Sequence, residues 1–299
     1  MIINKKEMMK MNNKFTISMI FLAESANYGE GIGNISALKK MSRGNFEQYS
    51  YISRQAMRYS IVNQLKWDNT EVDNSSGVVQ FSPNATIEEY PEIDLFGYMK
   101  TISKKDKEKG GSLTRRAVVR LSNAISLEPY QSDLEFLTNM GLAKRKNYEN
   151  AIAQSEVHRS YYTYTITIDL EDVGIDGDIE ISKEEKINRV HKLLDTVQYL
   201  YRDIKGRREN LSPLFVIGGT YEIGNPFFEN RLKVENNKLK VNIIKEILEK
   251  EFVKNNTIIG MVTDTFDNDE VIKNELEVKS IVEAFDGYKK KVKDYYESN

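Results

Sequence analysis

Residues 39–66 gather side chains that could hold the phosphates of a nucleic acid. The segment carries six positive residues against one negative residue, a net charge of +5. Proteins bind phosphates with cations, hydroxyls, amides and the N–H groups at a helix N-terminus. The second half of the segment has helical spacing, and a charged run is also typical of a solvated helix face. The groups in question belong to Arg43, Ser53, Arg54, Gln55 and Arg58.

A second basic segment spans residues 100–120, with eight positive residues against two negative residues and a net charge of +6. Gly110 and Gly111 make its middle flexible. A flexible basic loop can follow a phosphate backbone, with an affinity that falls as salt rises. A loop that only keeps the protein soluble explains the sequence equally well.

Two other groups suggest different chemistry. Residues 29–33 have the pattern GxGxG after a strand, a weak match to a dinucleotide-binding loop. A nucleotide-binding enzyme is therefore one alternative, although a loop that needs positive φ is the better interpretation. Residues 169–178 hold five acids without the EF-hand pattern of a calcium site. We interpret them as an acidic loop between a strand and a helix.

The chain contains only two histidines, His158 and His191. This argues against a metal site built from several histidines and leaves few candidates for the base of a catalytic triad. His158 is flanked by Glu156 and Arg159 and is interpreted as a surface or interface residue, with acid–base catalysis as the lesser alternative. His191 falls within an amphipathic helix and is interpreted as structural.

The composition is that of an ordinary globular chain. The 299 residues are 40% hydrophobic and 29% charged, with a net charge of -2 and a pI of about 6.0, so any basic surface must be local. The absence of cysteine excludes disulfides and thiolate metal sites and fits an intracellular, cytoplasmic protein. The longest apolar run near the N-terminus covers residues 17–23, too short to span a bilayer, which suggests no membrane partner.

Hydrophobic patterns predict the elements that must position these residues. The clearest strand covers residues 161–170, with Tyr162 and Tyr164 on its apolar face and therefore in the core. Ser182 and Glu185 form a capping box before a helix that Gly206 ends. Further strands are predicted at 15–23, 78–81, 214–221 and 257–262, and helices at 51–65, 131–142, 241–253 and within 275–288.

The core order is strand, helix, strand, strand, helix, strand. This βαββαβ order is typical of ferredoxin-like and RRM-like domains, so we expect an α+β fold. Such folds host many functions, and the order alone does not decide among them.

Several motifs, taken in order, resemble the DevR-like family. They are ISMIFLA at 17–23, YISRQAMR at 51–58, DLFGYM at 94–99, NAISL at 123–127 and the pair GG at 218–219 leading to NPFF at 225–228. Members of this family are backbone subunits of type I-B CRISPR surveillance complexes (Cascade), within the RAMP superfamily. The similarity covers most of residues 14–229.

The resemblance implies an RRM-like palm with long insertions. The palm would comprise residues 14–66 and 161–265. Residues 67–130 would form an inserted finger or web region, residues 131–160 a thumb, and residues 266–299 a C-terminal helical segment. Several copies would stack head to tail along the guide RNA and grip it through its backbone, so that base pairing reads the target.

The resemblance also implies the partners and the contacts. The partners would be the crRNA, target DNA paired to it, further copies of the chain, a small RAMP-type capping subunit, a large subunit and a recruited helicase-nuclease. No cofactor, metal or catalytic residue is expected; the alternative is a metal-dependent RNA endonuclease of the same superfamily. The predicted RNA contacts are Asn27, Arg43, Ser53, Arg54, Gln55, Arg58, Arg115, Arg116, Ser122, Asn123, Lys144, Arg145 and His158.

Overall fold

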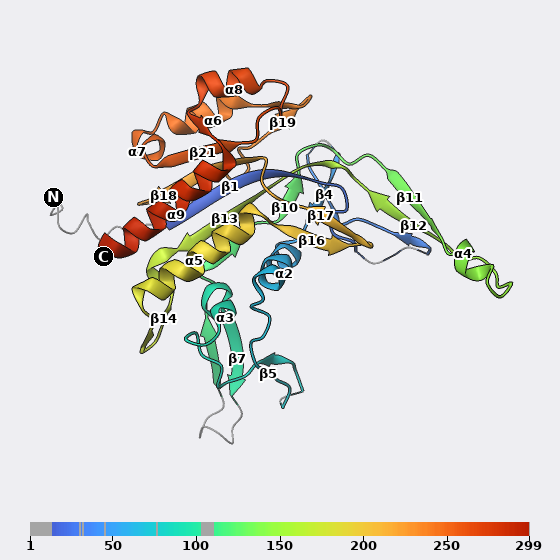
Figure 1. Ribbon diagram of the computed structural model, residues 1–299, viewed down its shortest axis with the longest axis horizontal. Helices are drawn as coiled ribbons and strands as arrows, with labels where there is room; N and C mark the ends of the chain where they lie inside the picture. The colour runs from blue at the N-terminus through green and yellow to red at the C-terminus, as the bar shows by residue number, and fades with distance from the viewer. Residues whose placement is uncertain are drawn as a thin grey trace.

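The computed structural model in Figure 1 describes residues 14–298, apart from 30, 32, 45, 76 and 103–110. These residues form a mixed α+β fold around one large sheet, which confirms the α+β class. The sheet has nine strands in the order β22-β21-β18-β1-β13-β10-β4-β3, and β9 also pairs with β13. Several small two- and three-stranded sheets project from it.

The centre of the sheet consists of β1 (Lys14–Ala23), β13 (Ser160–Asp169) and β18 (Phe215–Tyr221). β1 pairs antiparallel with both neighbours, and Met19 lies opposite Tyr164. Side chains alternate between the two faces of a strand, so the odd residues of β1 and the even residues of β13 share one face. That face is buried, as predicted for Tyr162 and Tyr164.

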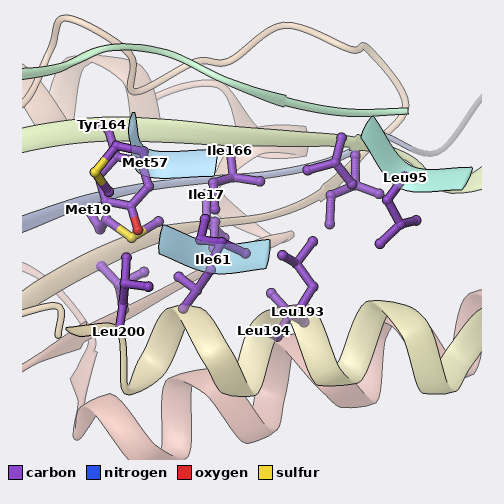
Figure 2. Close-up of a cluster of buried hydrophobic side chains, with 14 of the residues drawn as sticks. Ile17, Met19, Met57, Ile61, Leu95, Tyr164, Ile166, Leu193, Leu194 and Leu200 are labelled. Carbon is purple, nitrogen blue, oxygen red and sulfur yellow. The ribbon is translucent and has the colours of Figure 1, made fainter. Parts of the chain in front are cut away.

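Three helices cover this buried face. They are α2 (Arg54–Leu65), α5 (Lys183–Gln198) and α9 (Ile281–Ser298). Figure 2 shows Met57 and Ile61 of α2 and Leu193 of α5 packed against Met19 and other strand residues. A continuous apolar core therefore joins the sheet to helices that are far apart in the sequence.

Serine side chains cap both α2 and α5; the cap at Ser182 is as predicted, whereas the helix predicted over 51–65 begins later, after Ser53. Ser53 caps α2, where its hydroxyl accepts a hydrogen bond from the N–H of Ala56. Residues 51–52 end a strand instead of starting the helix. Ser182 caps α5 by accepting from the N–H of Glu185. In both cases the capping side chain satisfies a donor that has no partner within the helix, which fixes where the helix begins.

The expectation that the second helix runs to Gly206 is wrong. α5 ends at Gln198, and the chain continues as a hairpin of β16 (Tyr201–Ile204) and β17 (Arg207–Asn210). The hairpin turn places Lys205 at φ 50° and Gly206 at φ 77°. Two consecutive residues with positive φ suit the twist of a two-residue hairpin, so the glycine makes a turn between strands instead of a helix end.

Three other predicted helices also differ from the structure. Residues 131–142 mostly form β11 (Asp133–Thr138), which pairs along its whole length with β12 (Ile152–Val157); only α4 (Met140–Ala143) is helical. Pairing between distant segments overrides local helical spacing here. The helix predicted at 241–253 is divided into α6 (Val241–Leu248) and α7 (Glu251–Lys254). The C-terminal helix, predicted within 275–288, begins inside that range at Ile281 but extends ten residues beyond it.

The second face of the sheet is only partly covered. Residues 226–276 pack on the half nearest β18 and β21 through a second apolar cluster that includes Ile20, Phe215 and Ile244. This layer contains β19 (Val234–Glu235), β20 (Lys238–Leu239), α6, α7 and α8 (Asp269–Glu275). The half of this face nearest β10 and β4 remains open.

The remaining elements are short. Across the described part of the chain, no helix combines the length and the apolar character needed to cross a bilayer. The strands are β2 (Ile35–Ser36), β3 (Lys40–Ser42), β4 (Gln48–Ile52), β5 (Val72–Asp73), β6 (Gln80–Phe81), β7 (Tyr98–Ile102), β8 (Gly111–Arg115), β9 (Val119–Leu121), β10 (Ala124–Ser126), β14 (Ile175–Asp176), β15 (Ile179–Glu180), β21 (Thr257–Met261) and β22 (Val278–Lys279), and the helices are α3 (Pro91–Phe96) and the 3-10 helix η1 (Leu170–Asp172).

Candidate nucleic-acid interface

A wide groove of about 1410 Å³ lies on the open half of the second sheet face. This volume exceeds the roughly 300–1,000 Å³ of most small-molecule sites. One wall comes from β3, β4 and the start of α2, the floor from β9, β10 and β13, and the other wall from residues 229–240. Five cations line it against three acids: Lys39, Arg43, Arg54, Lys233 and Lys240 against Glu47, Glu229 and Glu235.

The first wall carries more positive than negative charge. Lys39, Arg43 and Arg54 line it together with Glu47. The Arg43 guanidinium stacks over the ring of Tyr49, 3.9 Å from its centroid, while the backbone N–H of Arg43 donates to the carbonyl of Glu47. The stacking holds the guanidinium against the ring, and Arg43 lines the groove.

Four predicted contact residues meet at the N-terminus of α2. The Asn27 side-chain oxygen accepts hydrogen bonds from the Ser53 hydroxyl at 2.7 Å and the Ser53 N–H at 3.2 Å. The Asn123 side-chain oxygen accepts from the N–H of Arg54 at 2.9 Å. Two segments from outside the helix therefore hold its first turn, and the exposed side chains of Arg54 and Gln55 lie on the groove.

The floor combines polar and half-buried apolar side chains. The Ser122 hydroxyl accepts from the N–H of Thr165 at 2.9 Å and donates to the carbonyl of Asn123. Leu121, Ile125 and Leu127 line the groove beside them. Because these side chains offer apolar contact without base-specific donors or acceptors, the floor suits sugars and base faces of any sequence.

The opposite wall was not predicted from the sequence. It supplies Lys233 and Lys240, and the Lys240 ammonium forms an ion pair with Glu235. Glu229 lies on the same wall, where burial raises the pKa of its carboxyl. Lysines alternate with acids and amides in this segment, so its net charge does not mark it as a phosphate-binding wall. Only the packing of residues 226–276 on the sheet brings this wall to the groove.

Arg58 is on α2 but not among the residues that line the groove. Its guanidinium lies 3.3 Å from the Glu92 carboxylate and over the ring of Phe96, and its side chain is 35% exposed. Lys40 likewise pairs with Glu156 at 2.7 Å. Burial alone would raise the pKa of Glu156, but hydrogen bonds from Lys40 and from the N–H of Leu38 hold it below the usual value.

Arg115 and Arg116 are held by acids on the other side of the sheet. The Arg115 guanidinium is 6% exposed and donates to the buried Asp94 carboxylate at 2.7 Å and to the carbonyl of Asp172. Arg116 pairs with the Asp172 carboxylate but remains largely exposed. Neither residue lines the groove, and their contact with RNA stays a prediction.

Lys144 and Arg145 lie far from the groove. They follow α4, at the end of an arm formed by β11 and β12 that projects from the body of the molecule (Figure 1). Their side chains are exposed. The arm also exposes large apolar side chains, namely Leu134, Phe136, Leu137, Met140, Leu142, Tyr148 and Ile152.

The expectation that His158 lies at a surface is wrong. Its side chain is 5% exposed, because the turn before β13 packs it against the edge of Tyr130. Its Nδ1 is 2.7 Å from the Ser50 hydroxyl, which also contacts the hydroxyl of Tyr162. Burial lowers the pKa of His158 below its usual value. A buried, hydrogen-bonded imidazole of this kind stabilises the base of the arm.

The acids of residues 169–178 are used in ion pairs. Asp169 contacts Lys14 at 3.1 Å and Arg120 at 2.7 Å, and Asp176 accepts from the hydroxyl of Tyr98. Within the described ranges, no group of three or more histidines, cysteines or acids is placed to hold a metal ion. The glycine loop at 29–33 and the basic loop at 103–110 fall wholly or partly outside those ranges.

Two solved structures share this fold over nearly the whole chain. They are titled "CRISPR RNA-guided surveillance complex" and "CRISPR RNA-guided surveillance complex, pre-nicking". Their TM-scores are 0.57 and 0.56 at 13% and 11% sequence identity, and each match covers 95% of this chain and 99% of the other.

Sequence comparison gives the family. A curated relative, the CRISPR-associated protein Cas7/Cst2/DevR of Myxococcus xanthus (strain DK1622), is 27% identical over 158 residues, 48% of this chain. The match spans about half the length of that relative, 52%. A family model described as "CRISPR-associated negative auto-regulator DevR/Csa2" matches residues 15–242. Because that match covers well over half of the residues, this chain belongs to the DevR/Csa2 family of CRISPR-associated proteins.

Proposed function

We propose that this chain is a repeated backbone subunit of a CRISPR surveillance complex and holds guide RNA by its sugar-phosphate backbone. The observation that carries the proposal is the groove, in which Lys39, Arg43 and Arg54 line one wall beside a floor that offers apolar contact to sugars and base faces. A strand gripped by its phosphates can have any sequence and keeps its bases available for pairing. Membership of the DevR/Csa2 family supports the same conclusion.

The central strands suit the palm of such a subunit. The order β18-β1-β13-β10, with α2 and α5 on one face, is that of an RRM-like βαββαβ unit. In RRM domains the face away from the helices binds RNA, and here the groove lies on that face. We propose that residues 14–66 and 161–265, joined by β10, are the palm and that the rest of residues 67–130 is the finger or web region, in a type I-B complex.

The arm of β11, α4 and β12 suits the thumb that would join neighbouring copies. Its exposed apolar side chains include Phe136, which is 58% exposed. If the arm contacts a different surface of the next copy, the contact is heterologous, and it repeats as an open filament when the rotation between copies does not close a ring. The RNA would then set the number of copies.

The other partners that we propose for this chain are target DNA and further proteins of the complex. Target DNA would pair with the bound crRNA, while a small capping subunit and a large subunit would close the two ends of the filament. A recruited helicase-nuclease would cut the target. This chain itself would be non-catalytic and would act in the cytoplasm.

The test is RNA binding by purified wild-type and variant protein, measured by fluorescence anisotropy on a labelled single-stranded RNA. We expect Arg43→Glu and Arg54→Glu each to weaken binding about tenfold and to reduce the salt dependence by about one phosphate contact. Lys192→Glu is the matched control, because Lys192 lies exposed on α5, across the sheet from the groove. Equal loss in all three variants would contradict the proposal.

A cleavage assay tests whether this chain is non-catalytic. Incubation of the assembled complex with Mg²⁺ and complementary RNA should leave the RNA intact. Cleavage at regular intervals, abolished by a single acid-to-alanine change, would instead show an endonuclease.

A further inference from the structure

The loop that follows β1 rests on the hairpin of β16 and β17. Glu209 of β17 accepts hydrogen bonds from the backbone N–H groups of Glu24 at 2.8 Å and Ser25 at 3.2 Å. Arg207 donates to the same oxygen at 3.0 Å, and the other oxygen accepts from Arg202 at 2.7 and 2.8 Å. The carboxylate is 7% exposed and fully hydrogen-bonded, so it fixes the backbone at the start of the loop.

The same loop holds two parts of the groove wall through Asn27. The Asn27 side-chain oxygen binds Ser53, the cap of α2, by two hydrogen bonds. The backbone carbonyl of Asn27 accepts from the N–H of Lys39 at 2.6 Å. Lys39 in turn holds Tyr51 through a backbone hydrogen bond at 3.0 Å. One residue of the loop therefore sets the position of a groove cation and of the helix that carries Arg54.

From these contacts we infer that Glu209 and Asn27 are positioning residues for RNA binding. Glu209 fixes the loop, and Asn27 transmits that position to Ser53 and to the first turn of α2. The inference rests on the proposed function and gives Asn27 an indirect role.

The geometry at Asn27 favours this indirect role over direct contact with RNA. Its side-chain oxygen already accepts two hydrogen bonds, and its amide nitrogen donates to the carbonyl of Tyr28 at 3.4 Å. Asn27 does not line the groove, whereas Ser53 does. A ligand in the groove would therefore meet Ser53 and Arg54 but not the Asn27 amide.

A double-mutant cycle on RNA affinity separates the two roles. Asn27→Ala should weaken binding roughly fivefold, the effect of losing hydrogen bonds that hold a helix cap. Ser53→Ala should weaken it at least as much. If Asn27 acts through Ser53, the double variant should bind like Ser53→Ala alone. If the losses of affinity in the two single variants multiply in the double variant, Asn27 has an independent contact and the inference is overturned.

The hairpin is tested by Glu209→Gln with Asp203→Asn as the control. Asp203 is an exposed acid of the same hairpin that pairs only with Arg208, at 2.9 Å. Glu209→Gln should speed hydrogen exchange at the amides of Glu24 and Ser25 and weaken RNA binding about fivefold, whereas Asp203→Asn should change neither. RNA affinity equal to wild type in a folded Glu209→Gln protein would refute the role of Glu209. If Glu209→Gln does not fold, Arg207→Ala makes the same test, because it removes one donor to the Glu209 carboxylate; wild-type RNA affinity in that variant would refute the role of Glu209.

Failure of the inference can be told apart from failure of the proposed function. Wild-type affinity in Asn27→Ala and Glu209→Gln, with weakened Arg43→Glu and Arg54→Glu, would refute only the positioning role. Wild-type affinity in all four variants would refute RNA binding in the groove.

Discussion

Arg54 and Arg58 lie about one turn apart on α2, but their side chains have different surroundings. Arg54 is exposed on the groove, whereas Arg58 pairs with Glu92 and stacks on Phe96. Because an α-helix has 3.6 residues per turn, side chains four positions apart point in similar directions. Only the neighbouring elements therefore distinguish the surroundings of Arg54 from those of Arg58. Residue type and spacing predicted both as phosphate contacts; the structure separates them.

We expect the two charge reversals to differ. Arg54→Glu should weaken RNA binding about tenfold, and Arg58→Glu should weaken it less, because its guanidinium must leave Glu92 before it can reach RNA. Anisotropy titrations at several salt concentrations measure both effects. An equal loss in affinity and in salt slope would show that Arg58 exchanges its ion pair for a phosphate.

His158 should make stability depend on pH. Burial lowers the pKa of its imidazole from the ordinary 6.5, so the unfolded chain binds a proton more readily than the folded one. The free energy of unfolding should therefore fall as pH drops below 6.5, until the lowered pKa of the folded state is reached. Urea denaturation between pH 8 and pH 5 measures this. His158→Gln should reduce the dependence of the free energy of unfolding on pH just below pH 6.5. An unchanged pH dependence would mean that other groups cause it.

At the scale of elements, a buried cluster ties the inserted region to α5. The Asp94 carboxylate is fully buried and contacts Arg115 at 2.7 Å and Arg189 of α5 at 2.9 Å. Arg189 also donates to the carbonyls of Ile87 and Glu88. The acid of the motif DLFGYM therefore has a structural role: its ion pairs hold α3 and the following strand against the core.

Replacement of this acid should destabilise the fold strongly. Asp94→Asn leaves two arginines without their buried partner and should lower the free energy of unfolding by about 3–5 kcal/mol. Asp195→Asn is the control. Asp195 pairs with Lys289 at 2.9 Å, and the Asp195 side chain is 51% exposed. Loss of this surface pair should lower the free energy of unfolding by at most about 1 kcal/mol. Urea unfolding curves compare the two. Similar midpoints would mean that the buried cluster contributes no more than a surface pair.

At the scale of the whole molecule, the projecting arm of β11, α4 and β12 (Figure 1) and the groove are built from different residues of one chain. The arm exposes apolar side chains that the monomer leaves without cover. Exposed apolar clusters of this kind mark contacts with other proteins, and in the proposed function the contact is another copy.

Phe136→Asp should shorten the assemblies that form on a long RNA. A charge at this site would be buried at the contact between copies and would cost more than the contact provides. Val282→Asp makes the same chemical change on α9, at a side chain that is also exposed, and should leave assembly unchanged. Mass photometry of the RNA-bound protein gives the copy number. Assemblies of full length with Phe136→Asp would exclude the arm from stacking.

The sequence by itself determined the local elements with a physical signature of their own. Alternation predicted β13, and the pair of Ser182 and Glu185 predicted where α5 begins, because these signals act within a few residues. Ordered motifs also indicated the family that the comparison confirms.

Only the tertiary structure decided what depends on distant pairing. It converted residues 133–138 into a strand of the arm, divided the arginines between the groove and buried acids, and brought residues 229–240 to the groove as a second wall. It also joined Glu209 to Asn27 through the loop after β1. Spacing along a chain says which groups are present, whereas their partners are set by packing between separate segments of the chain.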